Sequence, residues 1–153
     1  MIKIDNVFTR SQRLDLLKLC KPLCRVMKDY PASQSNAYIH NDKDIKPYIR
    51  IIKRKIEFAL ERDCDLSMVW VNEDRGYKKD IFWHTHPGYN WTAVYYMKTI
   101  PYINSGTLFE EEGFVRMKQN SMLLFPGWVK HGTPSYPFHW IKRYSIAMDI
   151  ELW

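Results

Sequence analysis

Hydrophobic residues recur every three to four positions in two segments before residue 65, with charged residues between them. This spacing is typical of amphipathic helices, and it predicts one helix over residues 11–30 and a second over 43–64. Ser11 is a suitable N-cap for the first helix, and Pro22 should kink or split it. Pro47 would lie in the first turn of the second helix, where a missing N–H group is tolerated.

After residue 65 the pattern changes to short segments rich in β-branched and aromatic residues. Gly, Pro, Asn and Asp separate them at the intervals expected of a β-sandwich or small barrel. The predicted fold is mainly β (α+β), a single domain over 1–153 with a helical part of about 1–64 and a β-barrel of about 65–153. The predicted strands lie within 66–74, 80–87, 90–99, 106–110, 113–118, 121–132 and 141–152.

Composition narrows the class of protein. The 153 residues are 46% hydrophobic and 15% aromatic, which suffices for one domain with a buried core and excludes wholesale disorder. A net charge of +6 would suit an anionic partner such as nucleic acid. Most Lys and Arg residues lie in the N-terminal half at helical spacing, however, which favours solvated helix faces over a nucleic-acid site.

Cysteine usage and the absence of targeting segments indicate a compartment. Cys20, Cys24 and Cys64 are three in number, so they cannot all pair, and we expect reduced thiols. The chain shows no charged and then apolar leader, and no apolar run of membrane-spanning length. We therefore expect a cytoplasmic protein that does not contact a membrane.

The stretch FWHTHPGYNW contains His84 and His86 one residue apart. On a strand, side chains at i and i+2 point to the same face. Both imidazoles could then reach one metal ion, while Trp83 and Thr85 would face the opposite layer. The pair alone leaves two interpretations open, a metal site or two histidines at the surface or in hydrogen bonds.

A third ligand would favour the metal site. His131 follows a turn at Pro126 and Gly127, and in a small barrel a late strand can lie beside an early one. His40 lies in a polar connection, and His139 in an expected loop. Three protein ligands leave open positions on an octahedral ion, as an oxygen-activating iron requires. A closed zinc site would need a fourth ligand.

Arg143 and Ser145 alternate along the last predicted strand, so they share a face. A guanidinium and a hydroxyl side by side could bind one carboxylate group of an organic acid. The alternative is an arginine paired with a structural Asp or Glu residue.

The order of His84, His86, His131, Arg143 and Ser145 resembles the signature of the Fe(II)/2-oxoglutarate-dependent oxygenases. The similarity is greater to the small bacterial and phage proteins of that superfamily, and it extends over about 66–150. The resemblance implies a double-stranded β-helix (jelly roll) with the N-terminal helices packed outside. It also implies Fe(II), 2-oxoglutarate and O2, with hydroxylation of an unidentified substrate and decarboxylation of 2-oxoglutarate to succinate.

The departure from the common His-x-Asp/Glu…His triad is His86, which stands where that triad has its carboxylate. A neutral imidazole there leaves the metal centre more positive, and this should strengthen its hold on an anionic co-substrate. It also makes the site similar to that of a three-histidine cupin dioxygenase acting on a small thiol. A cupin-like binding module without catalysis is a further alternative.

Aromatic residues supply the remaining candidates. Tyr96 shares the parity of the two histidines, unlike Tyr95, and would donate to the co-substrate carboxylate. The expected walls of a substrate pocket are Tyr89, Trp91, Trp128 and Trp140, although packing alone would also explain them. The two predicted helices either brace the barrel or form a homodimer interface.

Overall fold

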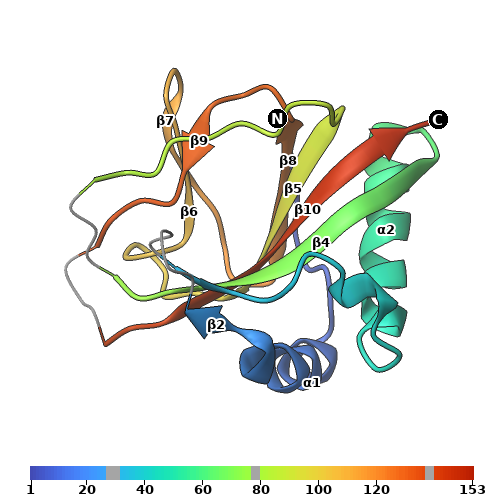
Figure 1. Ribbon diagram of the computed structural model, residues 1–153, viewed down its shortest axis with the longest axis horizontal. Coiled ribbons are helices and arrows are strands. Elements are labelled where there is room, and N and C mark those ends of the chain that lie inside the picture. The colour runs from blue at the N-terminus through green and yellow to red at the C-terminus, as the bar shows by residue number, and fades with distance from the viewer. Residues whose placement is uncertain (27–31, 77–79, 137–139) are drawn as a thin grey trace.

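The computed structural model describes residues 1–26, 32–76, 80–136 and 140–153. Two antiparallel sheets face each other, and the helices cover the outer face of the larger one (Figure 1). The larger sheet has the strand order β1-β8-β5-β10-β4-β3-β2 and the smaller β7-β6-β9. This arrangement confirms the predicted jelly roll with helices packed outside.

The strands are β1 (Ile2–Ile4), β2 (Arg25–Val26), β3 (Ser33–Gln34), β4 (Cys64–Asp74), β5 (Trp91–Lys98), β6 (Gly106–Phe109), β7 (Gly113–Arg116), β8 (Ser121–Pro126), β9 (His131–Gly132) and β10 (Arg143–Leu152). The helices are α1 (Arg10–Cys20) and α2 (Lys46–Leu60), with 3-10 turns η1 (Lys21–Leu23) and η2 (Ile39–Asn41). The strands β1 to β3 were not predicted, because two or three residues are too few to show an alternation.

Helix α2 follows the predicted amphipathic pattern. Ile49, Ile52 and Ile56 are buried along one face, and lysines and arginines separate them. Pro47 lies in the first turn, as predicted. The apolar stripe therefore packs α2 on the sheet, and each such side chain contributes roughly 1.5–3 kcal/mol by burial.

Helix α1 begins earlier than predicted. Its N-cap is Thr9, so the prediction of Ser11 was wrong. The Thr9 hydroxyl accepts from the Gln12 amide at 3.2 Å, and the Gln12 side chain accepts from the Thr9 amide at 3.0 Å. This reciprocal capping box needs Gln or Glu three residues after the cap, and Ser11 has Leu14 there. Pro22 ends the α-helix, which passes into η1.

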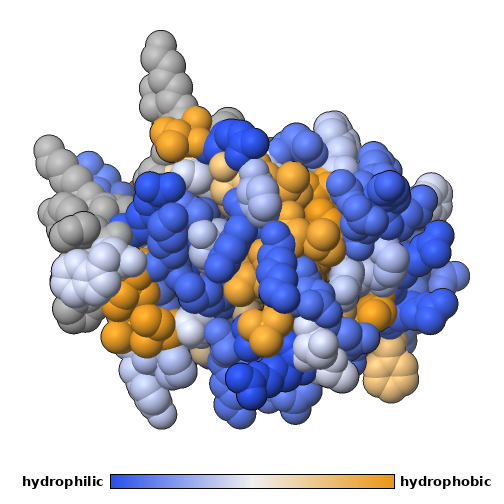
Figure 2. Space-filling view, turned by 90° about the horizontal axis from the view of Figure 1, so that it is seen from below, coloured by the Kyte–Doolittle hydropathy of each residue, from blue (hydrophilic) through white to orange (hydrophobic). Residues whose placement is uncertain are grey.

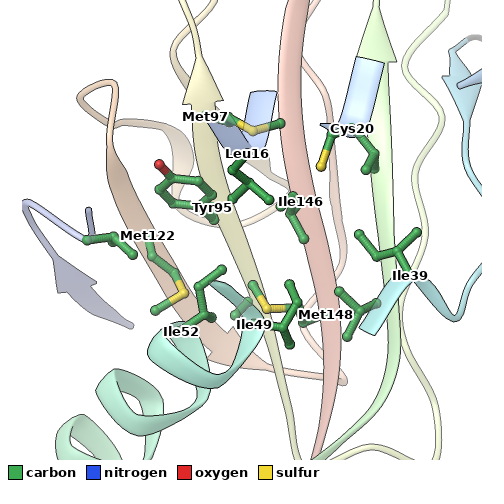
Figure 3. Packing of buried hydrophobic residues seen from close by; sticks show 14 of the residues in the cluster. Leu16, Cys20, Ile39, Ile49, Ile52, Tyr95, Met97, Met122, Ile146 and Met148 are labelled. Carbon is green, nitrogen blue, oxygen red and sulfur yellow. The ribbon is translucent and has the colours of Figure 1, made fainter. Parts of the chain in front are cut away.

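The two faces of the larger sheet have different roles. Even-numbered β10 residues such as Ile146 and Met148 lie in the core under the helices, together with odd-numbered Tyr95 and Met97 of β5. Figure 3 shows these four side chains with Leu16 and Cys20 of α1 and Ile49 and Ile52 of α2. Residues of the opposite parity on β5 and β10 face the smaller sheet, and they are more polar.

The segment 80–87 is not a strand, contrary to prediction. Its only ladder contact in the described chain is a single bridge between His84 and His131. Trp83 and Thr85 are exposed, so they do not pack into an opposite layer as expected. Local composition favoured a strand, but the segment is held by backbone hydrogen bonds to Gly127 and His131, which are distant in sequence.

The surface shows hydrophilic residues over most of the face seen from below, with hydrophobic patches between them (Figure 2). The three cysteines are free thiols. Among the helices of the described ranges, none has the length and apolar character that crossing a membrane requires.

Candidate functional site

Three histidines from two distant segments lie together at one end of the space between the sheets. The amides of His84 and His131 each donate to the other's carbonyl at 3.0 Å, and the His86 amide donates to Gly127 O at 2.7 Å. The ring centroids are 4.3 Å apart for His84 and His131, and 5.1 and 5.2 Å from His86 to these two. One potential ligand nitrogen from each ring lies within 4.8 Å of the other two.

Two glycines allow the histidine segment to lie so close to the β8–β9 connection. A Cβ on Gly127 would lie 2.5 Å from Tyr89 O, and one on Gly132 would lie 2.9 Å from Phe82 O. Any larger residue would push the segment away. The close approach therefore depends on these two glycines as much as on the histidines.

Each imidazole uses Nδ1 for a contact outside the cluster. Nδ1 of His84 lies 3.2 Å from Phe82 O, and Nδ1 of His131 lies 2.9 Å from Val129 O. Nδ1 of His86 lies 2.8 Å from a carboxylate oxygen of Asp149. These acceptors assign the Nδ1–H tautomer to the neutral rings, because the hydrogen bonds found for these rings among the described residues all involve Nδ1. Nε2 is then the nitrogen of each ring with a free lone pair.

Burial keeps two of the rings neutral. Desolvation, followed by the charge of neighbouring His84, lowers the pKa of His131 from 6.5 to about 3. Desolvation also lowers the pKa of His84. Metal ligation requires the unprotonated ring, so at neutral pH these two histidines need not release a proton to bind an ion.

The histidines form one wall of a cavity between the sheets. Its volume is about 30 Å³, which holds an ion or about two water molecules. Its lining comprises His84, His86, His131, Arg143 and Ser145 together with Trp70, Asn72, Thr92, Val94, Thr107, Gly132, Thr133 and Ala147. The five predicted metal and acid-binding candidates other than Tyr96 thus share one cavity, while most of its polar wall from β4 to β6 was missed. Strand parity could have found Asn72 and Thr92, because they continue the inward-facing alternation.

Arg143 is 2% exposed, and it lines the same cavity as the three histidines. Its Nη1 donates to Gly106 O at 2.6 Å and to Asn104 O at 3.4 Å. Its Nε is buried without a hydrogen-bond partner in the described chain, and it lies 3.9 Å from Asp74 Oδ2. A buried donor without a hydrogen bond costs folding free energy, so this nitrogen is suited to an anionic acceptor.

Tyr96 and Tyr95 separate as parity predicted. Tyr96 faces the smaller sheet, where its ring centre lies 5.0 Å from the guanidinium carbon of Arg143 and its hydroxyl is 2.5 Å from Thr107 Oγ1. Tyr95 lies in the opposite core and donates to Asn120 at 2.9 Å. Tyr96 thus supports the arginine from behind, while Thr107 lines the cavity.

The aromatic pocket candidates do not line the cavity. Trp91 packs against the core under the helices. Trp128 is 74% exposed and lies with Thr85 at a separate surface pocket. Tyr89 is half-buried but outside the cavity lining, and Trp140 is 67% exposed.

His40 is not part of the cluster described above. His40 lies on η2, at a surface pocket beside α2. His139 falls outside the described residues.

No protein-family model matches the chain, and no curated protein matches it. Solved structures do. SnoN, a non-heme α-ketoglutarate-dependent epimerase from nogalamycin biosynthesis, aligns with a TM-score of 0.76 at 11% identity, over 97% of this chain and 76% of its own. HygX from Streptomyces hygroscopicus, with nickel and 2-oxoglutarate bound, gives 0.73 at 10% identity, over 98% and 82%.

A 2OG-Fe(II) oxygenase family oxidoreductase from Burkholderia pseudomallei also gives a TM-score of 0.73, at 8% identity, over 96% of this chain and 82% of its own. At such identities the likeness shows the fold. The chain therefore has the jelly-roll fold of structures that include Fe(II)/2-oxoglutarate oxygenases, and it has a histidine cluster that could hold a metal ion.

Proposed function

We propose that this protein is an Fe(II)/2-oxoglutarate-dependent oxygenase that hydroxylates a substrate still to be identified. The observation that carries the proposal is the meeting of three imidazoles with Arg143 and Ser145 on one interior cavity of this fold. A metal-binding wall and an acid-binding wall so close together fit a metal and an organic acid bound as a pair.

His84, His86 and His131 would hold the metal through Nε2. Three neutral imidazole donors suit Fe(II) and disfavour Mg²⁺ or Ca²⁺, which prefer oxygen ligands. Metal–nitrogen bonds are about 2.1 Å, so an ion would draw the three nitrogens closer than their present spread of up to 4.8 Å.

Arg143 and Ser145 would hold the far carboxylate of 2-oxoglutarate. Both side chains project from the same face of β10. Nε of Arg143 has no hydrogen-bond acceptor among the described residues, although the carboxylate of Asp74 lies 3.9 Å away, so it can donate to a further acceptor. Tyr96 would keep the guanidinium plane in place by its ring contact. The cavity is smaller than a dicarboxylic acid, so binding requires wall side chains to move aside.

A bound metal and 2-oxoglutarate would together activate O2 as the oxidant, with loss of CO2 from 2-oxoglutarate to give succinate. The chain's own contribution is to position these groups and exclude water. Phe125 and Trp70 serve the exclusion, since their rings lie 4.6 Å from His131 and 5.8 Å from His86.

The test is anaerobic reconstitution with Fe(II) and 2-oxoglutarate, read by the visible metal-to-ligand charge-transfer band. The wild-type protein should give the band, and Arg143→Ala should weaken it severely. Arg50→Ala is the matched control, because it removes the same charge from an exposed position on α2. Ser145→Ala is a smaller change that should raise the 2-oxoglutarate concentration needed for half-maximal band intensity.

Other outcomes contradict the proposal in distinct ways. Iron binding without a band would instead favour the three-histidine dioxygenase of a small thiol, which needs no 2-oxoglutarate. Failure to bind iron at all would favour a binding module without catalysis. A band that Arg143→Ala and Arg50→Ala leave equally intense would refute the acid-binding role of Arg143.

A further inference from the structure

A buried carboxylate lies directly behind one of the three histidines. Asp149 on β10 is 0% exposed, and its Oδ1 lies 2.8 Å from Nδ1 of His86. The hydroxyl of Thr92 donates to the same oxygen at 3.4 Å. Oδ2 is buried with no hydrogen-bond partner in the described residues.

The three histidines differ in this respect. Nδ1 of His84 and of His131 contacts a neutral backbone carbonyl, whereas Nδ1 of His86 contacts a carboxylate. Within the described ranges, Asp149 is the only carboxylate at ion-pair distance from any of these three rings, and no Lys or Arg side chain lies at that distance from Asp149. The buried charge is thus directed at His86 alone.

A purely structural role explains this arrangement poorly. A carboxylate removed from water costs several kcal/mol unless it is well paired and fully hydrogen-bonded, and here one oxygen has no partner. A hydrophobic residue at this position would pack the sheet without that penalty. A carboxylate behind a metal-ligating histidine, in contrast, fixes the ring orientation and raises the basicity of the ligand nitrogen.

We propose that Asp149 is a positioning residue for the metal site, acting through His86. It holds the ring with Nε2 toward the other two imidazoles, and it supplies one negative charge a single hydrogen bond behind the ligand atom. The inference rests on the proposed metal-binding function and deepens it. His86 is then the one ligand of the three whose Nδ1 is hydrogen-bonded to a carboxylate, which brings a negative charge close to the metal site.

The first experiment uses Co(II) as the metal probe, without 2-oxoglutarate. Asp149→Asn preserves the shape and an acceptor oxygen but removes the charge, and it should weaken Co(II) affinity about 10–100-fold. Asp65→Asn is the matched control, because it removes one carboxylate from an exposed position on β4. Its affinity should equal that of the wild type.

Urea unfolding of the metal-free proteins separates positioning from structure. A loss of stability lowers the apparent Co(II) affinity only through the fraction of protein that is unfolded. If Asp149 positions His86, the Co(II) affinity of Asp149→Asn should fall by more than its unfolded fraction, measured without metal, accounts for. Unchanged Co(II) affinity overturns the inference, whatever happens to stability. Failure of the wild-type protein to bind Co(II) would instead refute the metal site itself, and with it the proposed function.

A second measurement needs no variant. In the Zn(II)-loaded wild-type protein, the Nδ1 proton of His86 should resonate downfield of those of His84 and His131, because only its acceptor is charged. Equivalent shifts for the three protons, or zinc bound through Nδ1 of His86, would overturn the inference even if Asp149→Asn did not fold.

Discussion

Acidification should destabilise the metal-free protein through His131, and the size of the effect follows from its burial. The ring is 4% exposed, and its pKa falls from 6.5 to about 3 on folding, chiefly because burial disfavours the charged form. Below pH 6.5 the unfolded chain therefore takes up a proton that the folded chain refuses. The free energy of unfolding must then fall as the pH falls, until the pH approaches 3.

The magnitude at pH 5 is large enough to measure. The unfolded-state pKa lies 1.5 units above that pH, while the folded state is still almost entirely neutral. At 1.36 kcal/mol per unit, the loss relative to pH 7 is about 2 kcal/mol from this one residue. The total free energy of unfolding of a natural protein is only about 5–15 kcal/mol.

The assay is urea unfolding of chelator-treated protein at pH 7 and pH 5, with His131→Asn as the comparison. The asparagine amide can still donate to Val129 O from the position of Nδ1, but it does not titrate. The wild type should lose about 2 kcal/mol more than the variant between the two pH values. Equal losses would refute the assignment of a neutral, buried imidazole to His131.

Further predictions concern the fold. Gly106→Ala should cost more than about 1 kcal/mol in urea unfolding, because φ is +149° and a Cβ would lie 2.3 Å from a carbonyl oxygen. Ile52→Ala should lower the free energy of unfolding by about 2–5 kcal/mol, whereas Phe58→Ala, at a position 87% exposed on the same helix, should change it by under about 0.5 kcal/mol. Cys20, whose pKa burial raises to about 12, should resist a thiol reagent at pH 8 until urea unfolds the chain; rapid native labelling would contradict its burial.

The long, regular elements were predictable because their signals are local. Helix α2 and the strands β5 and β10 each repeat a period over enough residues to be recognised. The same alternation correctly placed Arg143 and Ser145 on one face, and Tyr96 on that face in place of Tyr95. Two further steps of this alternation, through Ala147, would have placed Asp149 there as well.

The segment 80–87 shows where local signals fail. Its aromatic and β-branched residues favour a strand, yet its backbone bonds reach Gly127 and His131, more than 40 positions onward. The two glycines that permit this approach resemble ordinary turn residues in the sequence. The predicted convergence of His84 and His86 depended on a strand that does not form, although the rings still converge.

The sequence by itself determined the types of the long elements and the parity of their strands, since both arise from neighbours along the chain. It could not determine which side chains meet across the molecule. The contact between His86 and Asp149 joins residues on a loop and on β10, and it exists only because β10 lies between β4 and β5 beneath the smaller sheet. Alternation shows that a strand has two different faces, but only the packing of two sheets decides what each face touches.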